Sequence, residues 1–104
     1  MRDFVHVRDV ARANVIALRA PNGVCGAFNI ASGTPRSVGE LADALADAAG
    51  ADAPRPERTG EFRVGDVRHI FASPDRAVSE LGFHAQEDFA AGMREFAAAP
   101  LRSA

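Results

Sequence analysis

The chain has 104 residues, of which 47% are hydrophobic and 25% charged, and its formal net charge is −2. This composition excludes a collagen-like, disulfide-rich or disordered chain, and the small net charge excludes a global basic field that would attract nucleic acid or anionic lipid. No segment approaches the roughly 20 apolar residues that span a bilayer. The single cysteine, Cys25, excludes an internal disulfide and a CxxC site. We therefore expect one region, residues 1–104, in a reducing cytoplasm.

The first third of the chain predicts a β-α-β pattern. Asp3–Val7 and Ala27–Ala31 are short runs rich in β-branched or aromatic residues, which favours strands. Between them, Arg8–Ala20 has helical spacing, and Pro21-Asn22-Gly23 ends the helix with turn-forming residues. The residues on the expected apolar face of this helix are Ala11, Val15 and Leu18.

A second helix is predicted from Val38 to about Ala49. Ser37 and Glu40 form a capping box, in which the hydroxyl and the carboxylate each accept from a free backbone N–H, and Gly50 ends the helix. Its expected apolar face consists of Leu41, Ala44, Leu45 and Ala48. The proline-rich and charged segment Ala51–Gly60 predicts an extended connection.

The last third predicts one more strand and two helices. Arg68–Ala72 is the expected strand, after which Ser73 and Pro74 indicate an N-cap and a proline at the first helical position. This helix ends at Leu81-Gly82, and a final helix begins near Asp88. Its expected apolar face consists of Phe89, Met93, Phe96 and Ala97. The fold class predicted from these elements is α/β, with three to four helices and a few short strands.

Metal and thiol chemistry have little support in the sequence. His6, His69 and His84 are scattered and form no HxxxH pair on a helix, so we predict no metal site. Cys25 lies among small residues without a basic neighbour that would activate a thiolate, which favours a packing role.

Two clusters could bind a nucleoside diphosphate: Arg2-Asp3-Phe4, and the loop Arg63-Val64-Gly65-Asp66. A guanidinium binds phosphate through two parallel hydrogen bonds, a carboxylate accepts from ribose hydroxyls, and glycine lets the backbone approach a ligand. The alternative interpretation of R-x-G-D is a solvated turn with a local ion pair, and the sequence alone leaves it open.

Four segments in order identify a resemblance that covers almost the whole chain. They are R-D-F-V-H-V-R-D-V-A, F-N-I-A-S-G-T-P-R-S-V-G-E-L, R-V-G-D-V-R-H-I-F-A-S-P-D-R-A and L-G-F. Together they resemble the C-terminal third of the extended short-chain dehydrogenase/reductases, the NAD-dependent epimerase/dehydratase family. The similarity is greatest to nucleotide-sugar 4-epimerases, with dehydratases as near relatives.

The resemblance implies a two-part enzyme, in which an N-terminal Rossmann domain binds NAD and a smaller C-terminal part binds the nucleoside diphosphate sugar. It implies that Arg2 and Arg63 contact the diphosphate, that Phe4 lies beside the nucleotide and that Asp66 contacts the ribose. It also implies that the Ala27–Ala31 segment is a late strand of the NAD-domain sheet.

The chain departs from the family in its catalytic motifs. It contains no G-x-x-G-x-x-G and no tyrosine, so it cannot carry the family's Tyr-x-x-x-Lys pair. We predict that this chain alone has no catalytic residues, binds no NAD and does not turn over, as a truncated epimerase. The alternative is a non-catalytic nucleotide-sugar-binding or interaction module that pairs with another chain. The sequence leaves open which nucleotide and sugar are bound, and whether the family activity is that of an epimerase or a dehydratase. It also leaves open whether the chain forms a homodimer or pairs with an NAD-binding chain.

Overall fold

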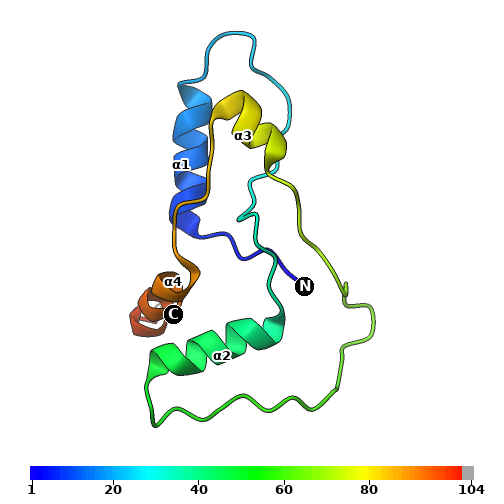
Figure 1. The fold of residues 1–104 in the computed structure, drawn as a ribbon, viewed down its shortest axis with the longest axis vertical. Helices are drawn as coiled ribbons and strands as arrows, with labels where there is room; N and C mark the ends of the chain where they lie inside the picture. The colour runs from blue at the N-terminus through cyan, green and yellow to red at the C-terminus, as the bar shows by residue number, and fades with distance from the viewer. Residues whose placement is uncertain (102–104) are drawn as a thin grey trace.

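The computed structural model describes residues 1–101 as four helices joined by extended segments (Figure 1). The helices are α1 (Val7–Leu18), α2 (Val38–Ala49), α3 (Asp75–Leu81) and α4 (Phe89–Ala98). α1 and α3 lie together in one half of the molecule, and α2 packs against α4 in the other. Within residues 1–101, no helix has both the length and the apolar character needed to cross a bilayer.

The three strands predicted from the sequence are wrong. Among the described residues, β-pairing is limited to two isolated bridges, which join Arg2 to Arg36 in the antiparallel sense and Arg2 to Ile70 in the parallel sense. Asp3–Val7 and Ala27–Ala31 contain no strand, and Arg68–Ala72 contributes only the bridge at Ile70. A strand is stable only beside neighbours that complete its hydrogen-bond ladder, and within residues 1–101 these segments have at most an isolated bridge.

The helix starts follow from local capping. The Ser37–Glu40 capping box is confirmed: Ser37 Oγ accepts from the Glu40 N–H at 3.1 Å, and Glu40 Oε2 accepts from the Ser37 N–H at 2.6 Å. These hydrogen bonds, first among them the one from the Ser37 backbone, hold the pKa of Glu40 below its ordinary value. Asp88 Oδ1 likewise accepts from the Ala91 N–H at 2.8 Å and starts α4 where the sequence predicted.

Two other helix boundaries differ from the sequence prediction. α1 begins one residue earlier and ends at Leu18, and His6 caps it because Nδ1 accepts from the Arg8 N–H at 3.1 Å. Pro74 occupies the N-cap of α3 rather than the first helical position, and Ser73 Oγ accepts from the Asp75 N–H at 3.1 Å.

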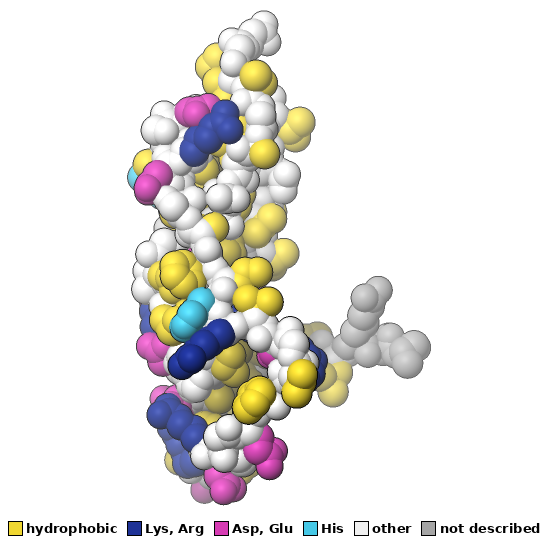
Figure 2. Space-filling view, turned by 90° about the vertical axis from the view of Figure 1, so that its right-hand side faces the viewer, with side chains coloured by type: hydrophobic (Ala, Val, Ile, Leu, Met, Phe, Trp, Pro, Cys, Tyr) yellow, Lys and Arg dark blue, Asp and Glu magenta, His cyan; other side chains and the backbone are white. Residues whose placement is uncertain are grey.

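The core is small, and the chain is expanded for its length. Ala13, Ala77 and Phe83 form a buried cluster against which five half-buried side chains pack: Ile16, Phe28, Ile30, Leu81 and Ala85. The radius of gyration is 16.6 Å, whereas a compact domain of about 100 residues has one of about 13 Å. Figure 2 shows hydrophobic side chains exposed along the face that carries much of the long connection between α2 and α3. The chain therefore buries little of its apolar surface.

Two apolar faces predicted from periodicity are not buried as expected. On α1, Val15 and Leu18 are 44% and 86% exposed, and on α4, Phe96 is 65% exposed. The residues that these helices bury are Asp9 and Ala13 on α1 and Gly92 on α4. On α2 the predicted face is half-buried, and Ala46 beside it is the buried residue. Periodicity finds an apolar face, but only tertiary contacts decide whether this chain covers it.

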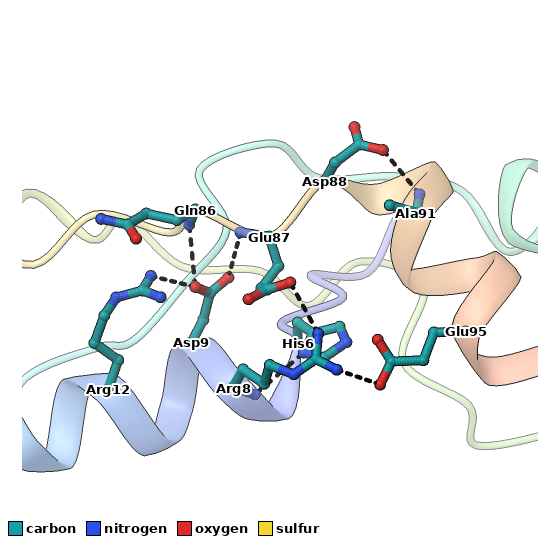
Figure 3. A network of polar contacts seen from close by, with 9 residues as sticks. All are labelled: His6, Arg8, Asp9, Arg12, Gln86, Glu87, Asp88, Ala91 and Glu95. Atoms are coloured by element: carbon teal, nitrogen blue, oxygen red, sulfur yellow. Dashed lines mark hydrogen bonds and ion pairs between the residues drawn. The ribbon is translucent and has the colours of Figure 1, made fainter. Parts of the chain in front are cut away.

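The carboxylate of Asp9, 2% exposed, holds the segment before α4 against α1 (Figure 3). Its oxygens accept from the backbone N–H groups of Gln86, at 3.0 Å, and Glu87, at 3.3 Å, and from the Arg12 guanidinium. Burial acts to raise the pKa of Asp9, but these hydrogen bonds outweigh burial and hold it below the ordinary value. The charged carboxylate is therefore the stable form in the fold.

We predict that Asp9→Asn lowers the free energy of unfolding by about 1–3 kcal/mol at pH 7, because a buried acceptor and its charge are lost. A carboxyl whose pKa is lowered in the folded state stabilises the fold above its ordinary pKa, and this contribution disappears as the pH falls through the folded-state pKa. The difference between the two proteins should thus narrow below about pH 4. Urea unfolding followed by circular dichroism measures it.

The matched control is Asp52→Asn, because Asp52 is exposed in the connection after α2. Equal stability of wild type and Asp9→Asn at pH 7, or a difference that grows in acid, would contradict this role for Asp9.

Candidate functional site

The structure brings Arg2, Arg63 and Asp66 together, although 60 residues separate the first two in sequence. Arg2 Nη2 donates to Asp66 Oδ1 at 3.3 Å, and Arg63 Nη2 lies 3.7 Å from the same oxygen. Two guanidinium groups therefore meet one carboxylate, which leaves the cluster with a net positive charge. This arrangement suits an anion that can take hydrogen bonds from both arginines.

The two arginines are held differently. Arg2 Nη1 also donates to the carbonyl oxygens of Met1, at 3.1 Å, and Arg68, at 3.3 Å. Its side chain is only 25% exposed, whereas that of Arg63 is 83% exposed and its ion pair with Asp66 is long. Arg2 is thus fixed in place by the protein, and Arg63 is free to reorient toward a ligand.

A tight turn places Arg63 and Asp66 on the same side of the loop. The Asp66 N–H donates to the Arg63 carbonyl oxygen at 3.1 Å, and Gly65 has a φ of +84° at the third position of the turn. A positive φ at this position is typical of a type II turn and favours glycine. The R-x-G-D spacing therefore sets the distance between the two side chains.

The backbone of Arg2 is anchored from two sides. Its N–H donates to the Arg36 carbonyl at 2.7 Å, and the Arg36 N–H donates back to the Arg2 carbonyl at 2.9 Å. On the other side, the Ile70 N–H donates to the Met1 carbonyl at 3.0 Å. These contacts join the N-terminal segment to the start of α2 and to the segment that follows the Arg63–Asp66 turn.

Phe4, the fourth predicted site residue, packs elsewhere. Its ring lies 6.1 Å from that of Phe89, tilted by 42°, and both rings line a cavity of about 730 Å³ between the N-terminal segment and α4. The Arg36 guanidinium lies 4.3 Å from the centre of the Phe89 ring, a cation–π contact. The role of Phe4 beside the nucleotide stays a prediction.

Sequence reasoning missed Arg36 and Asp9. Arg36 directly precedes the N-cap residue Ser37, and the capping box fixes the backbone at this point. The place of Arg36 beside a predicted helix start was therefore the available signal. Asp9 gave a weaker signal, because an acidic residue in the first turn of a helix is common and its partners lie 77 and 78 residues away.

Comparison with known proteins identifies the group to which these segments correspond. Residues 1–31 match the model of the NAD dependent epimerase/dehydratase family. The UDP-glucose 4-epimerase of Bos taurus is 36% identical over 87 residues, which are 82% of this chain and 24% of the relative. The dTDP-L-rhamnose 4-epimerase of Burkholderia thailandensis is 36% identical over 94 residues, 90% of this chain and 25% of that protein. The UDP-glucose 4-epimerase of Bacillus subtilis is 36% identical over 88 residues, which are 83% of this chain and 25% of the relative.

This chain belongs to the NAD-dependent epimerase/dehydratase family. The family implies a Rossmann-like fold for the full-length proteins, and the present chain spans about a quarter of the length of the curated relatives it matches. The four helices and isolated bridges of this chain are consistent with a fragment of such a fold.

The residues present do not fit the family's NAD. Gly23 and Gly26 begin a G-x-x-G, but Asn29 stands where the third glycine would be. They lie in an irregular segment, with no strand before them and no helix directly after them in the described chain. The sequence also has no tyrosine and no lysine. Within residues 1–101, no group of three or more His, Cys, Asp or Glu side chains could hold a metal ion. The candidate site is thus a positively charged cluster without a tyrosine and lysine pair of the family type.

We predict that Arg2→Ala lowers the free energy of unfolding by about 0.5–1.5 kcal/mol, because three hydrogen bonds are lost. Arg63→Ala should change it by less than about 0.5 kcal/mol, since an exposed ion pair contributes little. Chemical unfolding of both variants tests the contrast. A larger loss for Arg63→Ala than for Arg2→Ala would show that Arg2 is not the fixed member of the pair.

Proposed function

We propose that this chain is the C-terminal, nucleotide-sugar-binding portion of a nucleotide-sugar 4-epimerase and that Arg2, Arg63 and Asp66 contact the nucleoside diphosphate. The observation that carries the proposal is the meeting of the Arg2 and Arg63 side chains at Asp66. The names of the relatives support the ligand class, because they include UDP-glucose and dTDP-L-rhamnose 4-epimerases. We leave uridine and deoxythymidine as the two candidate nucleosides.

The geometry supports an exchange of partners on binding. In the free chain, Asp66 accepts from Arg2 and lies within ion-pair distance of Arg63. Phosphate oxygens offer the arginines stronger acceptors, because charged forks bind phosphate bidentately. Asp66 would then be released to accept from ribose hydroxyls. Arg2 keeps its two carbonyl acceptors throughout, so it serves as the fixed contact, while Arg63 closes over the ligand.

We propose that the chain is inactive by itself. Removal of a hydride from a sugar carbon requires a base for the hydroxyl proton and a cofactor that accepts the hydride. The chain has neither the tyrosine and lysine nor the glycine-rich motif that serve these purposes in the family. NAD binding and catalysis would come from the remaining portion of a full-length family member, and we place both portions in the cytoplasm.

The expanded shape and the exposed apolar side chains support pairing with another protein chain or domain. With a radius of gyration of 16.6 Å, the chain leaves large hydrophobic side chains such as Leu18 and Phe62, each 86% exposed, without a cover. Patches of this kind mark protein interfaces. The partner is either an NAD-binding portion or a second copy.

We predict that the chain binds UDP-glucose or a deoxythymidine diphosphate sugar in isothermal titration calorimetry. Arg63→Ala should weaken binding by about 1.5–3 kcal/mol, because a hydrogen bond to a charged group is lost. Arg94→Ala is the matched control, since Arg94 is an exposed arginine on α4. The absence of heat with both nucleotide classes, or equal weakening by the two variants, would contradict a ligand site at Asp66.

We also predict no epimerisation when the 104-residue chain is mixed with NAD and UDP-glucose. The assay is chromatographic separation of UDP-glucose from UDP-galactose, with the intact Bacillus subtilis relative as the positive control. Turnover by the chain that follows its concentration would show that it carries its own base and cofactor site.

A further inference from the structure

One half-buried arginine has no counterion within residues 1–101. Of the three half-buried arginines there, Arg2 and Arg12 pair with carboxylates. The guanidinium of the third, Arg36, makes no hydrogen bond or ion pair within these residues, and it lies 4.3 Å from the centre of the Phe89 ring. A guanidinium that stacks on a ring keeps its N–H donors free in its own plane. Arg36 therefore has unused donors beside the cavity that it lines.

Two acidic neighbours of Arg36 are already engaged in helix caps. Glu40 Oε2 accepts from the Ser37 N–H at 2.6 Å and from the Ser37 hydroxyl at 2.9 Å. Asp88, which lines the same cavity as Arg36, accepts from the Ala91 N–H at 2.8 Å through Oδ1. A charge removed from water is normally balanced by a partner of opposite sign. The position of Arg36 thus suits an anion that the chain itself does not supply.

The backbone places Arg36 directly beside Arg2. The Arg2 N–H donates to the Arg36 carbonyl at 2.7 Å, the Arg36 N–H donates back at 2.9 Å, and the bridge is antiparallel. Side chains at directly opposite positions of such a pair lie on the same face, with Cβ atoms about 4.5–5.5 Å apart. The Arg36 side chain therefore begins next to the one that reaches Asp66.

The charge of the candidate site also leaves room for a third arginine. Arg2, Arg63 and Asp66 together carry one net positive charge, whereas each phosphate of a nucleotide sugar carries a negative charge. Arg36 would supply the second positive charge. A charge-assisted hydrogen bond to phosphate is stronger than a cation–π contact at a half-exposed site, so the exchange of Phe89 for a phosphate is favourable.

We infer that Arg36 is a third arginine of the ligand site, which rests on Phe89 in the free chain and donates to the diphosphate of the bound nucleotide sugar. The inference rests on the proposed function, to which it adds a residue that changes partner on binding. Phe89 then holds the free guanidinium in place and is not itself a ligand contact.

The first test is calorimetric titration of the 104-residue chain with the nucleotide sugar that it binds, UDP-glucose or dTDP-glucose. Arg36→Gln should raise the Kd about tenfold, because a hydrogen bond to a charged group is lost. Arg36→Lys should raise it less, since an ammonium keeps the charge without the paired donors. Arg94→Gln, exposed on the same helix as Phe89, is the control and should bind like the wild type. The Tm of each variant is measured alongside.

The second test follows the Arg36 side chain directly by NMR. Its Nε–Hε signal, identified by its loss in Arg36→Gln, should be shifted upfield by the Phe89 ring in the free chain. Saturation with the nucleotide sugar should remove this shift. Phe89→Leu gives the reference position of the signal without the ring.

The outcomes separate this role from the proposed function. An unchanged Kd in Arg36→Gln, or an Arg36 signal that keeps its upfield shift at saturation, would overturn the role of Arg36 and leave the site at Arg63 intact. Equal weakening by the Gln and Lys variants together with a lowered Tm would assign Arg36 a structural role and overturn it as well. No heat from the wild-type chain with either nucleotide sugar would contradict the proposed function and this inference together.

Discussion

The buried carboxylate of Asp9 determines how the two halves of the chain are joined. It fixes the backbone at Gln86 and Glu87, and α4 begins two residues later, so the position of that helix follows from one charged group on α1. Arg8 adds ion pairs to Glu87 and to Glu95 on α4. α4 in turn packs against α2, and Arg36, just before the N-cap of α2, pairs with the backbone of Arg2. The contacts of Asp9 therefore also influence the position of the Arg2 guanidinium.

The candidate site combines a rigid element with an adaptable one. Arg2 is held by backbone bridges and carbonyl acceptors, while Arg63 extends into solvent from a tight turn. In a site with one preorganised side chain, part of the conformational entropy is already lost on folding rather than on binding. The mobile side chain can then adjust to a ligand. Asp66 pairs with both groups before a ligand arrives, which keeps two like charges from lying side by side without a counterion.

Local features were predictable from the sequence, and long-range ones were not. The capping box of α2 and the Asp88 cap of α4 involve residues three apart, so the pattern fixes them. The prediction of a strand at Ala27–Ala31 was wrong because β-propensity describes a single segment, whereas a strand forms only beside a neighbouring strand. The meeting of Arg2 with Asp66 was expected from a family resemblance. The cation–π contact between Arg36 and Phe89 depends on where α4 packs, so the helix start beside Arg36 did not indicate it.

The inward side of α1 combines Asp9 with the apolar residues Ala13 and Ile16, whereas several large apolar residues lie on its exposed side. Its inward side organises the segment before α4, because the buried carboxylate of Asp9 is stable only with specific partners, and those partners fix a geometry. Its apolar side makes no such demand and gains free energy from any close-packed apolar surface. The helix therefore has directional contacts on one side and exposed apolar residues on the other. The chain forms its polar contacts alone and yet stays expanded, because large apolar side chains on α1 and along the connection between α2 and α3 remain exposed.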